Sequence, residues 1–175
     1  KSEKGYITFP TKFDMVDDIL NVKGKDRVII RMSVNPKEII ERVEFGTSPL
    51  EKRVEAINKL KNAGYRVGIL IAPVIFVDNW KELYEELIRY LNKNLTEEVK
   101  KDLFFEVIFM TYSYIHRKIN EEAFPGAINL YSQELMTGRG KGKYTYKQEQ
   151  RKNGEDFLHE LLNKYFPGNK IVYFS

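Results

Sequence analysis

The 175-residue chain contains no cysteine, which excludes disulfides, thiolate nucleophiles and zinc or iron-sulfur sites held by its own thiolates. Its two histidines, His116 and His159, are too few for a histidine-rich metal site, so we expect no metal ligands in this chain. No apolar run has the length of a membrane span, and the lysine-rich start lacks the adjoining apolar segment of a signal peptide. We therefore expect a cytoplasmic protein without a membrane anchor.

A composition of 42% hydrophobic and 31% charged residues is enough for one full core, so residues 1–175 are predicted to form a single domain. The net charge is +4, yet residues 138–152 alone carry net +5, which leaves the rest of the chain close to neutral. The basic residues of this stretch are Arg139, Lys141, Lys143, Lys147, Arg151 and Lys152. Such a local patch suits a contact with phosphates, and a solvated lysine-rich loop explains it about equally well.

Strand-like and helix-like segments alternate along the chain, which is typical of parallel α/β units. The predicted strands are residues 6–9, 28–34, 67–75, 103–109 and 171–174. Several are apolar throughout, as in parallel sheets covered on both faces, and four or five strands are too few for a closed eight-stranded barrel. We therefore predict a partial (half) TIM-like barrel followed by a basic β-hairpin region at 130–147. Because half a barrel leaves an open strand edge, self-association is expected.

Local signals set the expected element boundaries. Pro10 is expected to end the first strand, and Asp14 to cap a helix containing Val16 and Ile19. Asn35 and Ser48 each stand before a proline and three residues before a glutamate, which predicts two helix N-caps. Glycines interrupt the basic stretch and predict the hairpin turn.

Polar or unusual residues follow the predicted strands at their carboxyl ends, where parallel α/β folds bind ligands. These residues are Lys12, Ser33, Asn35, Ala72, Pro73, Thr111 and Tyr112. A lysine, a hydroxyl and an exposed backbone suit a zwitterionic, ribose-bearing ligand. A simpler interpretation, which the residues alone favour, is that Ser33 and Asn35 finish a strand and cap a helix while Lys12 is a surface lysine. The chain contains no phosphate-loop, dinucleotide or serine-elbow motif.

Six segments, in order and in spacing, resemble the C-terminal half of the spore photoproduct lyase family over nearly the whole chain. They are TKFD at 11–14, RMSVN at 31–35, TSPLEKR at 47–53, AGY at 63–65, IAP at 71–73 and GKGKY at 140–144. The resemblance implies a radical S-adenosylmethionine DNA repair enzyme with a partial (β/α)6 barrel. The positions that match the family's S-adenosylmethionine pocket are Lys12, Ser33 and Ala72. The positions that match its DNA-contacting hairpin are Arg139, Lys141, Lys143 and Tyr144.

The resemblance also implies the chemistry. A reduced 4Fe-4S cluster cleaves S-adenosylmethionine to a 5′-deoxyadenosyl radical, which abstracts hydrogen from the dithymine spore photoproduct in DNA and so restores two thymines. The family's three-cysteine cluster motif and its hydrogen-donating cysteine have no counterpart in this chain. We therefore expect an inactive C-terminal part of a lyase of the spore cytoplasm, with a Cys-x-x-x-Cys-x-x-Cys motif encoded upstream of Lys1.

Two other hypotheses are compatible with the sequence. The chain could be a stand-alone nucleic-acid-binding module that uses the basic hairpin and performs no chemistry. A weaker alternative is a small α/β domain that binds a nucleotide-like metabolite. The resemblance assigns no role to Thr111 and Tyr112, because residues 109–112 differ from the family's form.

Overall fold

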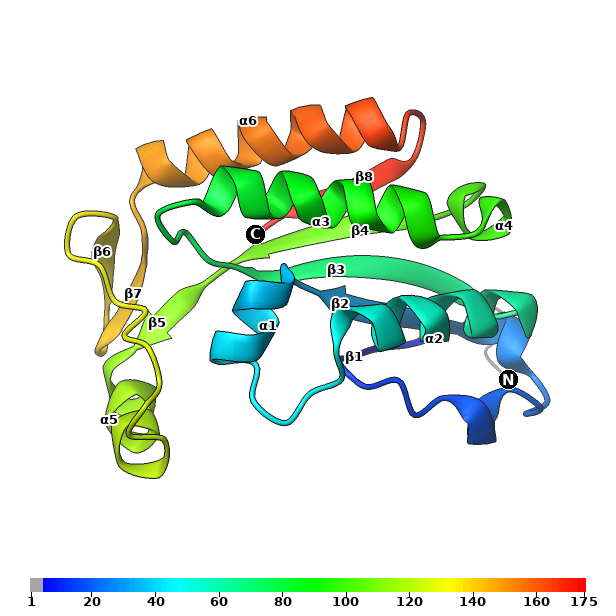
Figure 1. Cartoon of the computed structure of the whole chain (residues 1–175), viewed down its shortest axis with the longest axis horizontal. Helices are drawn as coiled ribbons and strands as arrows, with labels where there is room; N and C mark the ends of the chain where they lie inside the picture. The colour runs from blue at the N-terminus through cyan, green and yellow to red at the C-terminus, as the bar shows by residue number, and fades with distance from the viewer. Residues whose placement is uncertain (1–4) are drawn as a thin grey trace.

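The structure, a computed structural model, describes residues 5–175 as a mixed α/β fold with two sheets (Figure 1). The larger sheet has five parallel strands in the order β1-β2-β3-β4-β8. These strands are β1 (Ile7–Thr11), β2 (Val28–Val34), β3 (Arg66–Val74), β4 (Phe104–Phe109) and β8 (Lys170–Phe174). All five predicted strands are confirmed, with boundaries within two residues.

Helices pack on one face of this sheet (Figure 1). They are α1 (Lys37–Val43), α2 (Leu50–Asn62), α3 (Trp80–Asn94), the short α4 (Glu97–Lys100) and α6 (Gln148–Tyr165). Along β2, Ile30 and Met32 enter the core beneath the helices, whereas Ile29 and Arg31 alternate toward the other face. The core therefore lies between the sheet and one helical layer.

The smaller sheet is antiparallel and has the order β5-β7-β6. Strands β6 (Met136–Gly140) and β7 (Lys143–Tyr146) form the predicted hairpin, and β5 (Thr111–Ser113) adds a third strand. Helix α5 (Tyr114–Ala123) follows β5, and this whole unit lies beyond the carboxyl ends of the parallel strands (Figure 1). The sequence did not predict β5, because three residues are too few to show a strand period.

Two boundary predictions at the start of the chain are wrong. Pro10 does not end β1 but lies inside it, opposite Arg31, because an edge strand can leave one backbone position without an N–H donor. Asp14 does not cap an α-helix. The segment after it contains a short 3-10 helix, Asp17–Ile19, and a second one, Lys25–Arg27, precedes β2.

The two predicted proline-associated caps are also wrong. Helices α1 and α2 begin directly after Pro36 and Pro49 and have no side-chain cap. The Asn35 amide instead donates to Glu44 at 2.7 Å, and the Ser48 hydroxyl donates to the Asp14 carboxylate at 2.6 Å. Tertiary hydrogen bonds have thus taken the side chains that the local pattern assigned to capping.

Within residues 5–175, no helix combines the length and the apolar character needed to cross a membrane.

Helix α6 approaches the end of the large sheet closely at Gly154. A Cβ atom added at this position would lie 2.5 Å from Phe76 Cζ and 2.8 Å from Phe109 Cε1. Both rings are buried, so neither has space to move away. Gly154 therefore permits the contact that positions α6 against the strand ends.

We expect Gly154→Ala to lower the free energy of unfolding by about 1–2 kcal/mol, because overpacking costs about 1–3 kcal/mol and helix propensity returns at most about 1 kcal/mol. Urea unfolding monitored by circular dichroism measures this change. Gly126→Ala is the control, since an added Cβ there has no heavy atom within 4 Å. A Gly154→Ala protein as stable as the wild type would contradict the close packing.

Candidate functional site

The carboxyl ends of three neighbouring strands meet at one carbonyl oxygen. Lys12, directly after β1, donates from Nζ to the Ala72 oxygen at 2.9 Å. Ser33, in β2, donates from Oγ to the same oxygen at 2.9 Å. The structure thus brings together three of the seven residues that the sequence placed at the strand ends, since parallel strands end on the same side of a sheet.

A buried carboxylate, Glu44 at the end of α1, joins this rim to the fold. Its Oε1 lies 2.5 Å from Lys12 Nζ and accepts a hydrogen bond from Asn35 Nδ2 at 2.7 Å. Its Oε2 lies 2.8 Å from Arg53 Nη2, in an ionic contact without hydrogen-bond alignment. Glu44 is 8% exposed and Arg53 is 0% exposed, so these charges are held inside the protein.

Arg53 connects the rim to its supporting loop. It donates from Nε to the Ser48 carbonyl at 2.7 Å, from Nη1 to the Ser33 carbonyl at 3.0 Å and from Nη2 to Thr47 Oγ1 at 2.7 Å. Neither Arg53 nor Glu44 is among the site residues predicted from the sequence. Arg53 could have been found, because it occupies the buried face of a predicted helix between Leu50 and Ile57, where an arginine is unusual. Glu44 had no comparable signal.

The electrostatics of the rim follow from this arrangement. Burial lowers the pKa of Lys12, and the contact with Glu44 opposes that change. Burial alone would raise the pKa of Glu44, but its hydrogen bonds to Lys12 and Asn35 and the Arg53 charge bring that pKa below its ordinary value. With all three charged groups ionised, the cluster of Lys12, Arg53 and Glu44 has a net charge of +1.

A cavity of about 350 Å³ opens beside Lys12, a size suited to a small ligand. Its walls include Arg42, Phe45, Pro73 and Phe124, and most of its lining is apolar. Of the three predicted pocket residues, Lys12 lines this cavity. The other two lie beneath the rim, where Ser33 is 3% exposed and Ala72 is 8% exposed. Their visible role is to fix the rim, through the shared hydrogen bonds at the Ala72 oxygen.

The rim cavity adjoins a second hollow of about 380 Å³ that reaches β5 of the small sheet. Pro73 and Phe124 line both hollows, and Tyr112 and His116 line only the second. The rim and the small sheet therefore border one depression made of two adjoining hollows.

A tyrosine cluster, formed by Tyr112, Tyr131 and Tyr144, supports the hairpin. The Tyr131 ring centroid lies 5.4 Å from that of Tyr112 and 5.0 Å from that of Tyr144. Tyr146 anchors the same strand more deeply, because its hydroxyl accepts a hydrogen bond from the Phe76 backbone at 3.2 Å. Burial raises the pKa of Tyr146 to about 12, so this phenol remains neutral. The hairpin is thus attached to the end of β3.

The predicted DNA-contacting cations lie on the hairpin and are exposed. Arg139, Lys141 and Lys143 form no ion pair with any other described residue. The turn between the strands has positive φ at Gly140, Lys141 and Gly142, with values of 81°, 52° and 68°. Glycines at two of these positions make the turn accessible and leave the cations at its tip. Tyr144 is half-buried in the tyrosine cluster.

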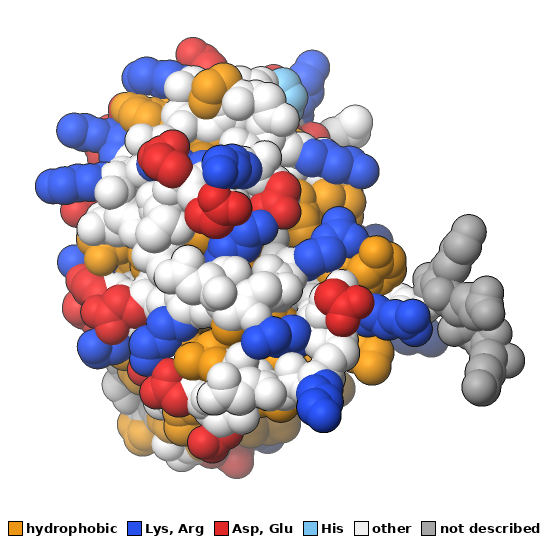
Figure 2. All heavy atoms as spheres, turned by 90° about the vertical axis from the view of Figure 1, so that its right-hand side faces the viewer, with side chains coloured by type: hydrophobic (Ala, Val, Ile, Leu, Met, Phe, Trp, Pro, Cys, Tyr) orange, Lys and Arg blue, Asp and Glu red, His pale blue; other side chains and the backbone are white. Residues whose placement is uncertain are grey.

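The basic stretch does not act as one patch over its full length. Arg151 lies in α6, where its Nε is 2.8 Å from Glu155 Oε1 and its Nη2 donates to the Phe174 carbonyl at 3.3 Å. At the end of the molecule opposite the hairpin, Lys and Arg side chains alternate with Asp and Glu (Figure 2). An uncompensated basic surface is therefore a property of the hairpin and not of that end.

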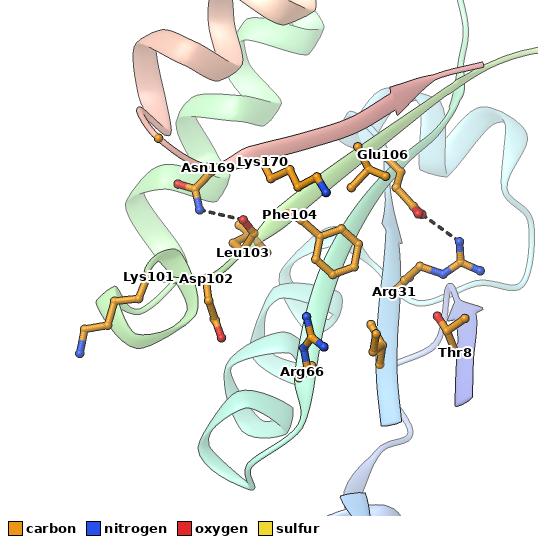
Figure 3. Close-up of a pocket in the computed structure, with 13 residues that line it drawn as sticks. Thr8, Arg31, Arg66, Lys101, Asp102, Leu103, Phe104, Glu106, Asn169 and Lys170 are labelled. Atoms are coloured by element: carbon orange, nitrogen blue, oxygen red, sulfur yellow. Dashed lines mark hydrogen bonds and ion pairs between the residues drawn. The ribbon is translucent and has the colours of Figure 1, made fainter. Parts of the chain in front are cut away.

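A third hollow, of about 470 Å³, lies on the sheet face without helices (Figure 3). Arg31 donates from Nη1 to Glu106 Oε2 at 2.9 Å across its wall, and Glu106 is 7% exposed. The Phe104 ring covers Gly68 on the neighbouring strand. This hollow is lined by the amino-terminal parts of the strands, away from the ligand-binding ends of parallel sheets. We therefore place the candidate site at the rim.

The residues of this chain do not fit an iron-sulfur cluster or another metal centre. The sequence has no thiolate, and residues 5–175 contain no group of three or more His, Asp or Glu side chains placed to hold a metal ion.

Comparison with known proteins gives concordant matches. A family model described as "Spore photoproduct lyase" matches residues 1–175. The curated spore photoproduct lyase of Bacillus subtilis (strain 168) is 32% identical over 179 residues, which cover 100% of this chain and 52% of the relative. That of Geobacillus sp. (strain Y412MC61) is 29% identical over 178 residues, covering 99% and 52%. This chain therefore spans about half the length of the curated relatives it matches.

Solved structures agree with these relatives. A spore photoproduct lyase complexed with dinucleoside spore photoproduct has a TM-score of 0.91 and 29% identity, covering 98% of this chain and 52% of that one. A mutant with bound AdoMet and dinucleoside spore photoproduct gives the same TM-score, identity and coverage.

We expect Arg53→Met to lower the free energy of unfolding by about 3 kcal/mol or more, because it leaves the buried Glu44 carboxylate without one of its cations. Guanidinium unfolding provides the measurement. Lys52→Met is the control, since Lys52 forms an exposed pair with Glu55 that is worth at most about 1 kcal/mol. Equal losses in the two variants would show that the Glu44–Arg53 contact does not support the rim.

Proposed function

Because the chain belongs to the spore photoproduct lyase family, we propose that it acts as the C-terminal half of an S-adenosylmethionine-dependent lyase that repairs the spore photoproduct in DNA. The proposed reaction returns the dithymine lesion to two thymines in the cytoplasm of a spore-forming cell. One observation carries the proposal: the rim cavity at Lys12 adjoins a hollow lined by β5, the strand that pairs with β7 of the basic hairpin. A cofactor at the rim and a lesion held by the hairpin would lie in these adjoining hollows.

The rim residues fit S-adenosylmethionine. A lysine ammonium has three N–H donors, and Lys12 uses two of them on Glu44 and on the Ala72 oxygen. The third remains for the ligand, and the +1 charge of the cluster complements a carboxylate. Ser33 supports the site through its own bond to the Ala72 oxygen. When bound, S-adenosylmethionine supplies the 5′-deoxyadenosyl group from which the hydrogen-abstracting radical derives.

The iron-sulfur cluster of the family does not fit residues of this chain, and we assign its ligands to the other half of the lyase. In this proposal the five parallel strands form part of a partial barrel. The face that carries Arg31, Phe104 and Glu106 then lies toward the barrel interior, and β1 pairs with a strand from the other half. In the isolated chain, the exposed β1 edge favours self-association.

The hairpin fits a nucleic-acid contact. Arg139, Lys141 and Lys143 are exposed cations without ion-pair partners in the described part of the chain, which suits binding to phosphates. Tyr144 is held by the tyrosine cluster, of which Tyr112 lines the depression. A lesion moved out of the base stack would enter this depression, and aromatic rings beside a basic strand suit such a conformation.

A second candidate function is nucleic-acid binding without catalysis. It is supported by the same hairpin, by the missing thiolates and by the rim itself, in which Lys12 is already paired with Glu44. Binding of S-adenosylmethionine distinguishes the two candidates.

For the hairpin, we expect combined Arg139→Ala, Lys141→Ala and Lys143→Ala substitutions to weaken DNA binding. A plot of the logarithm of the binding constant against the logarithm of the salt concentration should also become less steep, by about 2–3, because three phosphate contacts are lost. Fluorescence anisotropy with lesion-containing oligonucleotides at several salt concentrations measures both effects. Combined Lys52→Ala, Lys93→Ala and Lys101→Ala is the control, with the same charge change at exposed sites outside the hairpin. An unchanged slope in the hairpin variant would remove it from the DNA site.

For the rim, we expect Lys12→Met to lower the affinity for S-adenosylmethionine about 10- to 100-fold, because a hydrogen bond to a charged group contributes about 1.5–3 kcal/mol. Isothermal titration calorimetry measures this affinity for the wild type, for Lys12→Met and for the control Lys52→Met. Equal affinities for the variant and the wild type would contradict the assignment of Lys12. A wild-type chain that binds DNA but no S-adenosylmethionine would favour the second candidate.

A further inference from the structure

Glu44 has no place in the predicted pocket, yet it is the acidic side chain that contacts Lys12. We propose that Glu44 is a positioning residue, which orders the Lys12 ammonium so that one N–H group remains available to the rim cavity. This inference rests on the proposed function, because the group that this N–H would meet is the carboxylate of S-adenosylmethionine. Glu44 itself acts only through Lys12.

The Glu44 carboxylate is fixed from several sides. Its backbone N–H donates to the Ile40 carbonyl at 3.0 Å, which holds it at the end of α1. Asn35 donates to Oε1, and Asn35 is in turn held by the Tyr84 hydroxyl at 3.2 Å. Arg53 lies against Oε2. The Glu44 side chain is only 4% exposed, so these contacts hold it in place.

Ordering Lys12 before the ligand arrives has a physical benefit. A free lysine side chain loses up to about 2 kcal/mol of rotamer freedom when it is fixed. The contacts with Glu44 and with the Ala72 oxygen fix Lys12 in the unliganded protein. A carboxylate entering the cavity then meets a preorganised cation, so less of its binding free energy is lost to ordering.

Glu44 also favours the charged form of Lys12. The charged groups near Lys12 are Glu44, Arg53 behind it and Arg42 on the cavity wall. Burial and the Arg53 charge lower the pKa of Lys12, and Glu44 raises it. Without the Glu44 charge, both lowering effects act unopposed. Because a ligand carboxylate needs the ammonium form, the alkaline limit of ligand binding would then move to lower pH.

The first test observes Lys12 directly, without ligand. In the wild type, we expect a Lys12 ¹⁵N ammonium signal that exchanges slowly with water in NMR spectra. Glu44→Gln should remove this protection and lower the pKa of Lys12 by about 1 unit or more, the usual effect of losing an adjacent opposite charge. Glu55→Gln is the control, because Glu55 forms an exposed pair with Lys52 on α2, outside the rim cavity, and its loss changes the charge equally.

Two further measurements keep the test decisive if Glu44→Gln does not fold. The wild-type exchange rate alone is diagnostic, since a Lys12 ammonium that exchanges as fast as a free lysine would overturn the proposal. Glu44→Asp keeps the charge beside Arg53 but withdraws the carboxylate by one methylene. We expect this variant to lose the exchange protection while the pKa of Lys12 changes less than in Glu44→Gln.

The second test titrates S-adenosylmethionine by calorimetry between pH 7 and 10. We expect about 10-fold weaker binding for Glu44→Gln and an alkaline limit at lower pH than in the wild type and Glu55→Gln. If binding and its pH profile match the wild type, the positioning role is wrong and the proposed function stands. If Lys12 responds as expected but the wild-type chain binds no S-adenosylmethionine, positioning is upheld and the proposed function fails.

Discussion

The rim of this protein depends on one buried carboxylate. Glu44 lies between Lys12 and Arg53, and through them it joins the segment after β1, the end of β2 and the loop before α2. Burying a carboxylate costs several kcal/mol unless its oxygens are paired, and here both oxygens have cationic neighbours. The arrangement of the site therefore follows from the need to pair this charge.

The order of elements brings the cationic hairpin to the same end of the molecule as the rim. Between β4 and α6 the chain leaves the parallel sheet and forms β5, α5, β6 and β7 before it returns to β8 (Figure 1). Tyr146 at the end of β7 and Gly154 in α6 both contact Phe76, which follows β3. The cationic hairpin is thus fixed beside the strand ends. The proposed function needs such a rigid attachment, because it places two ligands next to each other.

The sequence predicted the elements that have a regular apolar pattern. Its predictions failed where tertiary contacts decide which partner a side chain has. The five parallel strands and the convergence of Lys12, Ser33 and Ala72 follow from apolar patterns and from the rule that parallel strands end together. The predicted caps at Asn35 and Ser48 are wrong because these side chains donate hydrogen bonds to Glu44 and Asp14, which lie nine and 34 residues away in the sequence. Strand β5 was too short to have a period. Glu44 was missed because a buried acid after a helix has no sequence pattern until its cations are known.

The sheet face without helices also pairs its charges internally. Parallel sheets are usually covered on both faces, yet Arg31, Phe104 and Glu106 line an open hollow (Figure 3). Arg31 and Glu106 pair with each other there, so the face is polar at its centre and does not present a continuous apolar surface. At its margin, Ile7 is 66% exposed and Phe9 is 42% exposed on β1, whose outer edge has no partner strand among the described residues. In the proposed partial barrel, this apolar edge would accept a further strand while the paired charges of the face stay neutralised in the interior.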